Sequence, residues 1–521
     1  MPVRKTTPAP GELSPGLRRY LFVTAFLAGA AVLVVEILGA KMLTPYFGAS
    51  HFVWTAQITV TLLALAAGYY VGGWWADHGA EPGRIYAALA AAGVWLAATV
   101  VFCERLAYFG LKFPLALGSV VAALGLFLVP LALMAMVGPF FVRVLAPSLH
   151  GLGRTVGRLS AVSTVGSVAG VVLIGYVLIP LCRDSLSMLG CAAGLVLLAL
   201  VYFAVFARGG GKAGAAGALV AVAVLGAAGL RLESLRRPAG AVEVARANSH
   251  FGRLQVLDFT ESSRRYLAND FLVQNTYDPA TGRSQSMFTE MLRALSWVYT
   301  PRLESALSLG MGVGIVPMQL AQEGVRVDVV EINPEIVPLA ERWFGFRRDA
   351  VTLHLDDARH FLRVGTNRWD TIHLDAFLGD SCPTHLMSRE AFGAMRDRLT
   401  PEGTLVINTF ASLDPRKDFF AGSLQKTLAA VFRSVVIHPG RNGNTFFVAS
   451  DRAPLVPVRE PDLAKVPALL GPLVRDTLAT RVTDPLPGGI VLSDDYNPVE
   501  FRDATQREEV RRALALAMES R

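Results

Sequence analysis

The chain has 521 residues, enough for two or three domains, and 52% of them are hydrophobic while only 17% are charged. Because a soluble domain usually contains about 25% charged residues, this composition is not that of an ordinary soluble protein. The net charge of +7 comes without a basic run or interleaved basic and aromatic residues, so nucleic-acid binding is not expected. The four cysteines show no CxxC or Cys/His spacing, so neither a metal site nor a disulfide framework is predicted.

The first part of the chain has the pattern of a membrane domain. Residues 20 to about 230 are almost entirely apolar, and runs of about 20 apolar residues are long enough to cross a bilayer. Further runs follow the first at once, so the first is not a cleaved signal peptide. We therefore predict a membrane domain of about seven helices over 1–237. The expected spans are 20–40, 53–76, 84–103, 117–142, 158–180, 184–206 and 213–230, the last being the weakest.

Basic residues beside these spans predict the orientation of the domain. They precede the first span, flank the loop between the fourth and fifth, and follow the sixth: Arg4, Lys5, Arg18, Arg19, Arg143, Arg154, Arg158, Arg208 and Lys212. All of them lie on one side if the N-terminus is cytoplasmic. With seven spans, the C-terminal half would then lie outside the cell.

A few polar and small residues stand out within the spans. Glu36 is ionisable and lies inside the first span, where such a group is costly and is by default a functional hypothesis. It could instead reach the interface or pair with another span. Glycines at small-xxx-small spacing are expected to let helices pack closely: Gly68, Gly72 and Gly73 in the second span, and Gly166 and Gly170 in the fifth.

After residue 240 the pattern becomes that of a soluble α/β domain. Runs at 249–259 and 264–274 predict strands of a small antiparallel sheet, and 284–299 has the apolar spacing of a helix. Strands and helices then alternate, which predicts a parallel, doubly wound Rossmann-like sheet closed by an antiparallel pair. The expected strands are 305–311, 326–332, 351–355, 369–377, 403–410, 434–439 and 444–450, and the expected helices are 315–322, 334–344, 388–399 and 423–432.

A glycine-rich turn follows the first strand of this sheet. Gly310, Gly312 and Gly314 would let the backbone approach a ligand closely and would open the following helix toward it. Such turns are common, so the turn alone is weak evidence for a binding site.

Three acids follow the next three strands. Glu331 ends the second strand, about twenty residues after the turn, where an acid can accept hydrogen bonds from ribose hydroxyls. Asp357 follows the third strand, within reach of a base edge, and Asp375 ends the fourth, where a reacting centre would lie. Because ligands bind such sheets at the carboxyl ends of the strands, the turn and the acids together predict a nucleotide-type site.

These residues resemble the spermidine synthase (polyamine aminopropyltransferase) family, and more closely its branch with an N-terminal multi-span membrane domain. The resemblance is best over 249–410 and extends to EILGAKMLTPYFGAS, DAFLGDSCPTHL and LSDDYNPVE. It implies a class I methyltransferase-like catalytic domain over 301–521, preceded by a small β-strand domain and linking helix over 238–300. It also implies decarboxylated S-adenosylmethionine or S-adenosylmethionine as substrate, with no prosthetic group.

The resemblance also implies roles for individual residues. Gln274 corresponds to the family glutamine beside the donor, Glu331 to the ribose-binding acid and Asp357 to the adenine-binding acid. Asp375 corresponds to the base that deprotonates the attacking amine. Glu290 lies in the family's Tyr-x-Glu-Met helix motif and is expected at the substrate.

The remaining candidates have less definite roles. Tyr496 could close over the pocket or belong to the core, while Asp494 and Asp495 are expected to be solvated or to cap a helix. Cys382 is expected to be an ordinary loop thiol, and His373 to point away from the site.

The chain departs from the family where ammonium groups are bound. The family's Gly-Gly-Gly-Asp-Gly loop has Val313 in place of the Asp that grips the aminopropyl ammonium, and Ala294 replaces a histidine of the helix motif. Leu378 replaces the second acid that helps to hold the acceptor diamine, and Asp380 could substitute only in a reshaped loop. Because an unpartnered buried cation costs several kcal/mol, a conventional diamine and aminopropyl donor would be poorly held.

Three classes of function remain open. The first is a transferase of the aminopropyltransferase type, which moves the three-carbon arm to an amine and releases 5'-methylthioadenosine. In a close variant, a lyase or cyclase, the carboxylate or amine of S-adenosylmethionine itself attacks and no acceptor is needed. The second class is a methyltransferase, because the fold is shared. The third is a non-enzymatic membrane sensor, which the retained Asp375 disfavours.

We expect a multi-pass protein of the cell (inner) membrane with a cytoplasmic catalytic domain, because an adenosyl substrate is found in the cytosol. This conflicts with the parity of seven spans, so either the seventh segment does not cross or one span is miscounted. The expected partners are the lipid bilayer, the adenosyl substrate, possible polyamines and, as in other family members, a second copy of the chain.

Overall fold

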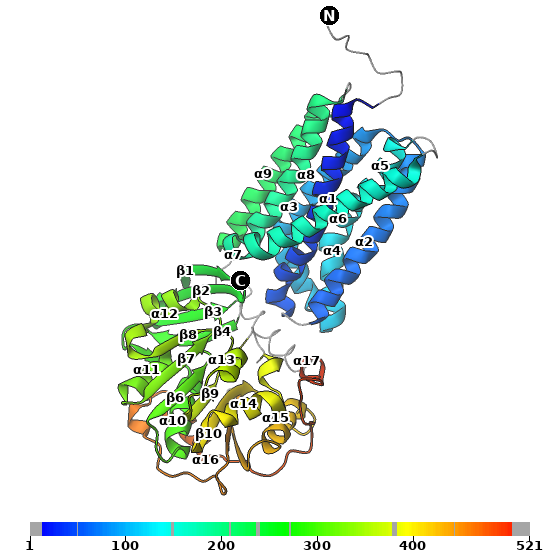
Figure 1. The fold of residues 1–521 in the computed structure, drawn as a ribbon. Helices are drawn as coiled ribbons and strands as arrows, with labels where there is room; N and C mark the ends of the chain where they lie inside the picture. Colours follow the sequence, from blue (N-terminus) through cyan, green and yellow to red (C-terminus); the bar gives the residue numbers. More distant parts are fainter. Residues whose placement is uncertain are drawn as a thin grey trace, which may run out of the picture. The chain divides into compact units, whose positions relative to one another are not determined.

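The computed structural model describes residues 13–48, 51–146, 151–207, 210–235, 240–269, 272–377, 383–441 and 443–502. It divides into two compact units, residues 1–236 and 237–521 (Figure 1). Some of the residues discussed above lie outside the described ranges: Arg4, Lys5, Arg208, Leu378, Asp380 and Cys382.

The N-terminal unit is a bundle of apolar helices. Within its described residues, seven helical segments are long and apolar enough to cross a membrane, as predicted. The fourth comprises two helices that meet at Met136, and the fifth contains a π-helical stretch. The elements are α1 Pro15–Phe47, α2 His51–Asp77, α3 Pro82–Gly110, α4 Leu115–Ala135, α5 Val137–Leu145, α6 Leu152–Leu173, η1 Ile174–Leu178, α7 Ile179–Leu181, α8 Asp184–Val205 and α9 Lys212–Leu235.

Glycines form the closest contacts between these helices. A Cβ on Gly68 of α2 would lie 2.3 Å from the carbonyl oxygen of Ala132 in α4, and one on Gly166 of α6 would lie 2.0 Å from that of Phe26 in α1. Gly72 and Gly170 face neighbouring backbone in the same way. The small-xxx-small spacing therefore marks helix contacts, since only residues without a side chain allow such an approach. Gly73 differs, because no atom of the described residues lies within 4 Å of the place of its Cβ.

Gly68→Val should destabilise the bundle, because the new side chain would overlap the backbone of α4 and force the helices apart. We expect a loss of about 1–3 kcal/mol, the usual cost of overpacking a tight contact, measured by thermal or denaturant unfolding in detergent. Gly73→Val is the matched control on the same helix and should leave stability unchanged. Equal stability of the two variants would contradict the contact.

The C-terminal unit begins with a small antiparallel sheet. Its strands are β1 Ala241–Ser249, β2 Gly252–Phe259, β3 Arg264–Asn269, β4 Leu272–Asp278 and β5 Arg283–Ser284, paired in sequence order. Helix α10, Met287–Tyr299, links this sheet to the larger one. The strand predicted at 264–274 is thus two strands, β3 and β4, and β1 and β5 add a further strand on either side of the predicted sheet.

The larger sheet has seven strands in the order β11-β12-β10-β9-β6-β7-β8. The five from β6 to β10 are parallel, while β12 runs antiparallel to both β10 and β11, so the expected closing pair is present. The strands are β6 Ser305–Leu309, β7 Arg326–Glu331, β8 Thr352–Leu355, β9 Trp369–Leu374, β10 Leu399–Phe410, β11 Ser434–Pro439 and β12 Asn444–Ser450.

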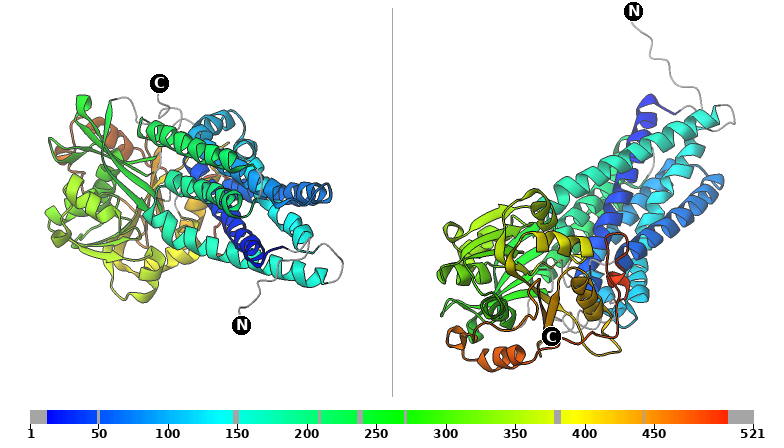
Figure 2. Two further views of the ribbon diagram at one scale, coloured as in Figure 1. Left: turned by 90° about the horizontal axis from the view of Figure 1, so that it is seen from above. Right: turned by 60° about the horizontal axis from the view of Figure 1, so that its bottom comes forward.

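Helices cover both faces of this sheet (Figures 1 and 2). Because side chains alternate along a strand, Val406 and Phe446 belong to the core beneath α10, α11, α12 and α16, and Ile407 and Phe447 belong to the core beneath α13, α14 and α15. The helices are α11 Ile315–Gln322, α12 Ile336–Phe344, α13 Ala358–Val364, α14 Arg389–Asp397, α15 Phe419–Ala429, α16 Gly471–Ala479 and the short α17 Val499–Arg502.

The strand order places a crevice at the middle of the sheet. From β6 the chain adds β7 and β8 on one side, then β9 and β10 on the other. Loops that leave the carboxyl ends of β6 and β9 therefore diverge, and ligands bind open α/β sheets at such a switch point. The glycine-rich turn follows β6, and Asp375 follows β9.

Candidate active site

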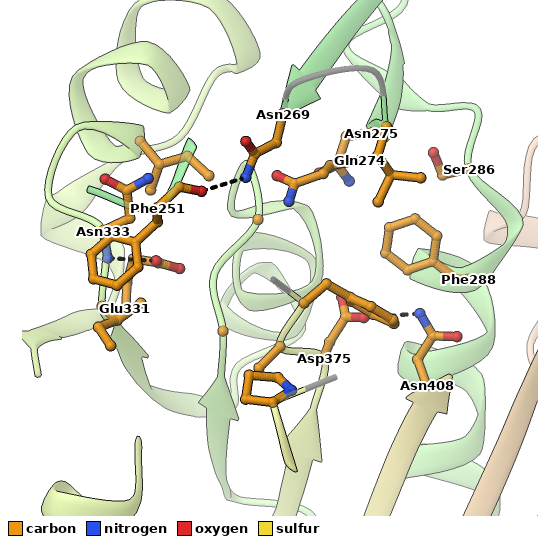
Figure 3. A pocket seen from close by; sticks show the side chains of 18 of the residues that line it. Phe251, Asn269, Gln274, Asn275, Ser286, Phe288, Glu331, Asn333, Asp375 and Asn408 are labelled. Atoms are coloured by element: carbon orange, nitrogen blue, oxygen red, sulfur yellow. Dashed lines mark hydrogen bonds between the residues drawn. The ribbon is translucent and has the colours of Figure 1, made fainter. Parts of the chain in front are cut away.

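A cavity of about 430 Å³ lies at the carboxyl ends of the strands (Figure 3). This is within the range of small-molecule sites, which are usually apolar with a few convergent polar groups. Its wall includes Gly310 and Gly312, Glu331, Asp357 and Asp375, so the structure brings most of the predicted residues together. The other polar and aromatic lining residues include Phe251, Asn269, Gln274, Asn275, Ser286, Phe288, Asn333, Asp356, Phe377, His385, Asn408, Phe410 and Asn444.

The glycine-rich turn brings β6 against the end of β9. Gly310 has φ 94°, and a Cβ there would lie 2.4 Å from the carbonyl oxygen of Asp375. Gly312 has φ 53°, and its Cβ would lie 3.0 Å from Oδ1 of Asn275. Gly314 does not line the cavity and instead faces the Phe346 ring. Glycine is required here both by the positive φ and by the close approach.

Val313, where the family has an acid, lies in the core and not at the cavity. Its side chain is 1% exposed and packs in the hydrophobic cluster that also contains Met311 and Val316. The turn therefore presents its backbone, and not the side chain of residue 313, to the cavity.

Glu331 is held by the backbone at the end of β7. One carboxylate oxygen accepts the N–H of Met311 at 2.9 Å and the other accepts the N–H of Asn333 at 2.8 Å. Burial raises the pKa of Glu331, and these N–H groups oppose the rise only in part. The bonds fix the carboxylate, while each oxygen keeps a further lone pair with which to accept from a hydroxyl.

Asp357 caps the first turn of α13. Its Oδ1 accepts the N–H groups of Arg359 and His360, both at 2.9 Å, and its Oδ2 lies 3.1 Å from Nε2 of His385. Burial alone would raise the pKa of Asp357, but the two N–H groups and the imidazole outweigh it, so the pKa is lowered. Asp357 is therefore ionised at the edge of the cavity, where it can accept from a donor on a base.

In the order of the strands, Asp375 lies at the opposite end of the cavity from Glu331 and Asp357. Its side chain is surrounded by protein except where it faces the cavity. Burial raises the pKa of Asp375 to about 6, although a hydrogen bond from Asn408 lowers it. A carboxyl group with this pKa is mostly ionised at pH 7 and holds a proton more readily than an exposed one, which suits a general base.

Two amides orient the Asp375 carboxyl group. Nδ2 of Asn408 donates to Oδ1 of Asp375 at 2.9 Å, and Nδ2 of Asn444 donates to Oδ1 of Asn408, also at 2.9 Å. Because the oxygen of Asn408 is engaged by Asn444, its amide must present N–H groups, and not the oxygen, to Asp375. Figure 3 shows Asn408 directed at Asp375 across the floor of the cavity.

The structure does not bring Glu290 or Tyr496 to the cavity. The Glu290 carboxylate is 1% exposed and is bound by Arg293 at 3.3 Å and Gln319 at 2.9 Å, inside the protein. The Tyr496 side chain is 60% exposed. As expected, His373 points away from the site: its Nε2 is bonded to Ser296 of α10, and burial lowers the pKa of His373 to about 4.

Asp494 has a larger part in the site than its sequence context indicated. Asp494 accepts hydrogen bonds from both terminal nitrogens of Arg359, and from Oγ of Ser388 at a distance of 2.5 Å. Arg359 also donates to the carbonyl oxygen of His385 at 2.8 Å. The segment around residue 494 thus fastens α13 and His385 together behind the Asp357 end of the cavity. No short-range signal pointed to this, because Asp494 lies 135 residues from Arg359.

Other wall residues were also missed. Asn408 lies near the end of β10, opposite Phe446, and Asn444 begins β12, opposite Phe410. Polar side chains within otherwise apolar strands are the sequence signal that could have identified both residues as part of the site. Phe251 lies in the turn between β1 and β2, and its carbonyl oxygen accepts from Asn269 at the end of β3, at 3.2 Å.

No protein-family model matches the chain. It is 37% identical over 141 residues to the polyamine aminopropyltransferase of Vibrio vulnificus, which is 26% of this chain and 47% of the relative. It is 28% identical over 187 residues to the N-terminal histidine N-methyltransferase of Emericella nidulans, covering 32% of this chain and 33% of the relative. The chain thus spans about half of the first relative and a third of the second.

A solved structure of spermidine synthase in complex with the transition-state analogue AdoDATO matches 50% of this chain and 88% of its own, with 18% identity and a TM-score of 0.36. The class defined by the two relatives matched by sequence is the superfamily of S-adenosylmethionine-dependent transferases. Over its C-terminal part, the chain has homologues in the spermidine synthase (polyamine aminopropyltransferase) family.

Asn408→Ala should raise the pKa of Asp375, because the carboxylate loses the donor that stabilises its charge. Asn444→Ala should also raise the pKa of Asp375, but by less, because Asn408 can still donate although Asn444 no longer holds its amide. The carboxyl band in pH-difference infrared spectra, assigned by its loss in Asp375→Asn, measures this without any assay of turnover.

Asn367→Ala, at an exposed loop position, is the control and should leave the pKa of Asp375 unchanged. A pKa in Asn408→Ala equal to that of the unmodified protein would show that the amide does not support the carboxylate.

Proposed function

We propose that the C-terminal unit binds a sulfonium nucleoside, decarboxylated S-adenosylmethionine or S-adenosylmethionine, and transfers its three-carbon arm to an amine, releasing 5'-methylthioadenosine. The observation that carries this is the position of Asp375, a buried carboxyl group with raised pKa at the switch point of the sheet. It shares one cavity with the acids Glu331 and Asp357.

The three acids divide the work by position. Glu331 is fixed by two backbone N–H groups and would accept the ribose hydroxyls. Asp357 is ionised at the neighbouring strand end and would accept from the exocyclic amine of adenine. Gly310 and Gly312 line the same cavity, where a turn without side chains would let the backbone approach the nucleoside closely.

Asp375 would act as the general base. The amine nitrogen attacks the arm carbon next to sulfur, the carbon–sulfur bond breaks with its electron pair going to sulfur, and Asp375 takes the proton that leaves the nitrogen. The sulfonium is already a good leaving group, so positioning and proton removal are the main contributions required of the protein. Asn408 and Asn444 keep the acceptor oxygen of Asp375 in place.

Two alternatives use the same cavity. Val313 is buried in the core, so the turn offers no carboxylate for the ammonium of an aminopropyl donor. This favours the variant in which a group of S-adenosylmethionine itself attacks and no acceptor is needed. Similarity to a histidine N-methyltransferase favours methyl transfer, which would yield S-adenosylhomocysteine.

The products separate the three reactions. Full-length protein is incubated with S-adenosylmethionine or its decarboxylated form, each with and without putrescine, and the products are identified by mass spectrometry. We expect 5'-methylthioadenosine: formed only with an amine it indicates transfer, and formed without one it indicates the intramolecular reaction. S-adenosylhomocysteine as the nucleoside product would overturn the proposal in favour of a methyltransferase.

Asp375→Asn should reduce turnover by about 10²–10⁴-fold, the usual contribution of a general base, while 5'-methylthioadenosine still binds. In the unmodified protein, kcat/KM should rise with pH and level off above about 6, because below the raised pKa of Asp375 the base already holds a proton. Asp349→Asn, at an exposed position, is the control. Full turnover in Asp375→Asn, or a profile flat between pH 5 and 8, would rule out this base.

Glu331→Gln should weaken nucleoside binding by roughly tenfold, because one of its two fixed acceptor oxygens becomes a donor. Calorimetric titration with 5'-methylthioadenosine measures this directly. Glu335→Gln changes an exposed carboxyl group four residues away and should bind as the unmodified protein does. Unchanged affinity in Glu331→Gln would remove the ribose role.

A further inference from the structure

A polar seam lies between the first two helices of the membrane unit. A Cβ on Gly39 of α1 would lie 2.9 Å from Nε2 of Gln57 on α2, and the Glu36 carboxyl and the Thr61 hydroxyl are hydrogen-bond partners. Glu36 is about one turn before Gly39, and Thr61 is about one turn after Gln57. The Gly39–Gln57 and Glu36–Thr61 contacts are therefore neighbouring contacts, one turn apart, in one antiparallel helix pair.

Gln57 is the unusual member of this seam. Its side chain is fully buried, and within the described residues neither the oxygen nor the nitrogen of its amide has a hydrogen-bond partner. A buried amide without partners costs several kcal/mol in an apolar surrounding, and in a bilayer no bulk water can satisfy it. Gly39 supplies the space for this amide, because any side chain there would overlap it. A helix pair built only for packing would gain from an apolar residue at 57.

The seam also carries a carboxyl group without a basic partner. Lys41, the nearest basic residue along α1, pairs with Asp184 at 3.5 Å. In the described part of the chain, Glu36 takes part in no ion pair. An ionisable group inside a membrane is expensive unless something compensates its charge.

Three acceptors lie within about one helical turn of one another along the seam. The Glu36 carboxylate and Oε1 of Gln57 can accept hydrogen bonds. The third acceptor is the Thr61 hydroxyl, which lies 2.9 Å from the carbonyl oxygen of Gln57. Its oxygen keeps two lone pairs whether its proton is donated to that carbonyl group or to Glu36. A primary ammonium group has three N–H donors and one positive charge. It therefore matches the number of acceptors and balances the charge of Glu36.

A cavity begins one turn farther along the same helices. It has a volume of about 440 Å³, and its wall includes Leu33 of α1 and Leu65 of α2, one turn from Glu36 and Thr61. The rest of its wall is mostly apolar, with a row of hydroxyls from α6: Ser160, Ser163, Thr164 and Ser167. This space suits the carbon chain of a ligand whose charged end lies in the seam.

We propose that Glu36, Gln57 and Thr61 bind the ammonium group of a primary amine inside the membrane unit, with the carbon chain of the amine in the adjoining cavity. This site is separate from the nucleoside cavity and does not depend on the reaction proposed for it.

The test is calorimetric titration of the full-length protein in lipid nanodiscs with n-butylammonium chloride, at constant ionic strength and with empty nanodiscs as the blank. We expect saturable binding of one butylammonium per chain, and weaker binding of methylammonium, which lacks the carbon chain. Glu36→Gln should lower the affinity by about tenfold or more, because a charge-assisted hydrogen bond is lost. Gln57→Leu should also weaken binding.

Glu104→Gln is the matched control, since it removes a carboxyl group from another helix of the unit, α3, and it should bind as the unmodified protein does. Thr61→Val, which keeps the side-chain shape, replaces Gln57→Leu if that variant does not fold. Absence of saturable binding, or equal affinity in Glu36→Gln, would overturn the proposal. Displacement of butylammonium by an equal concentration of sodium would assign the site to alkali cations and overturn it as well.

Discussion

The close approach of two backbone segments at the middle of the large sheet is the constraint on which the site depends. The backbone at Gly310 comes so near the carbonyl group of Asp375 that no side chain fits between them. This contact holds the turn after β6 against the end of β9, at the point where the strand order diverges. It joins in one cavity the acids that follow β7 and β8 with the carboxyl group that follows β9. A bulkier residue at 310 would separate the two ends of the cavity.

The pKa values of the three carboxyl groups of the cavity shift in different ways because their surroundings differ. Asp357 accepts two backbone N–H groups and faces an imidazole, so its pKa falls. Glu331 also accepts N–H groups but is almost fully buried, and its pKa rises. Asp375 is buried and, among the described residues, accepts from the Asn408 amide, which leaves its pKa at about 6. Burial and hydrogen bonding therefore give one kind of side chain different proton affinities within one cavity.

The sequence predicted the seven strands of the large sheet, the seven apolar helices and the residues at strand ends, because period-two and long apolar patterns are local signals. Glu331 and Asp375 were found for that reason. Local pattern could not show that Glu290 turns to Arg293, that Val313 packs into the core, or that Asn444 returns on an antiparallel strand to reach Asn408. Those placements depend on which face of an element meets which neighbour.

The fastening of the Asp357 end by Asp494 has a consequence for biosynthesis. Arg359 and Ser388 find their shared acceptor only at residue 494, and the N–H of Arg389 finds its own at Leu492. During translation the apolar helices emerge first, and the sheet can pair as soon as β12 has been made. The Asp357 end of the cavity has to wait for a further stretch of chain. A nascent chain can therefore be largely folded while the Asp357 end of its cavity is not yet fastened.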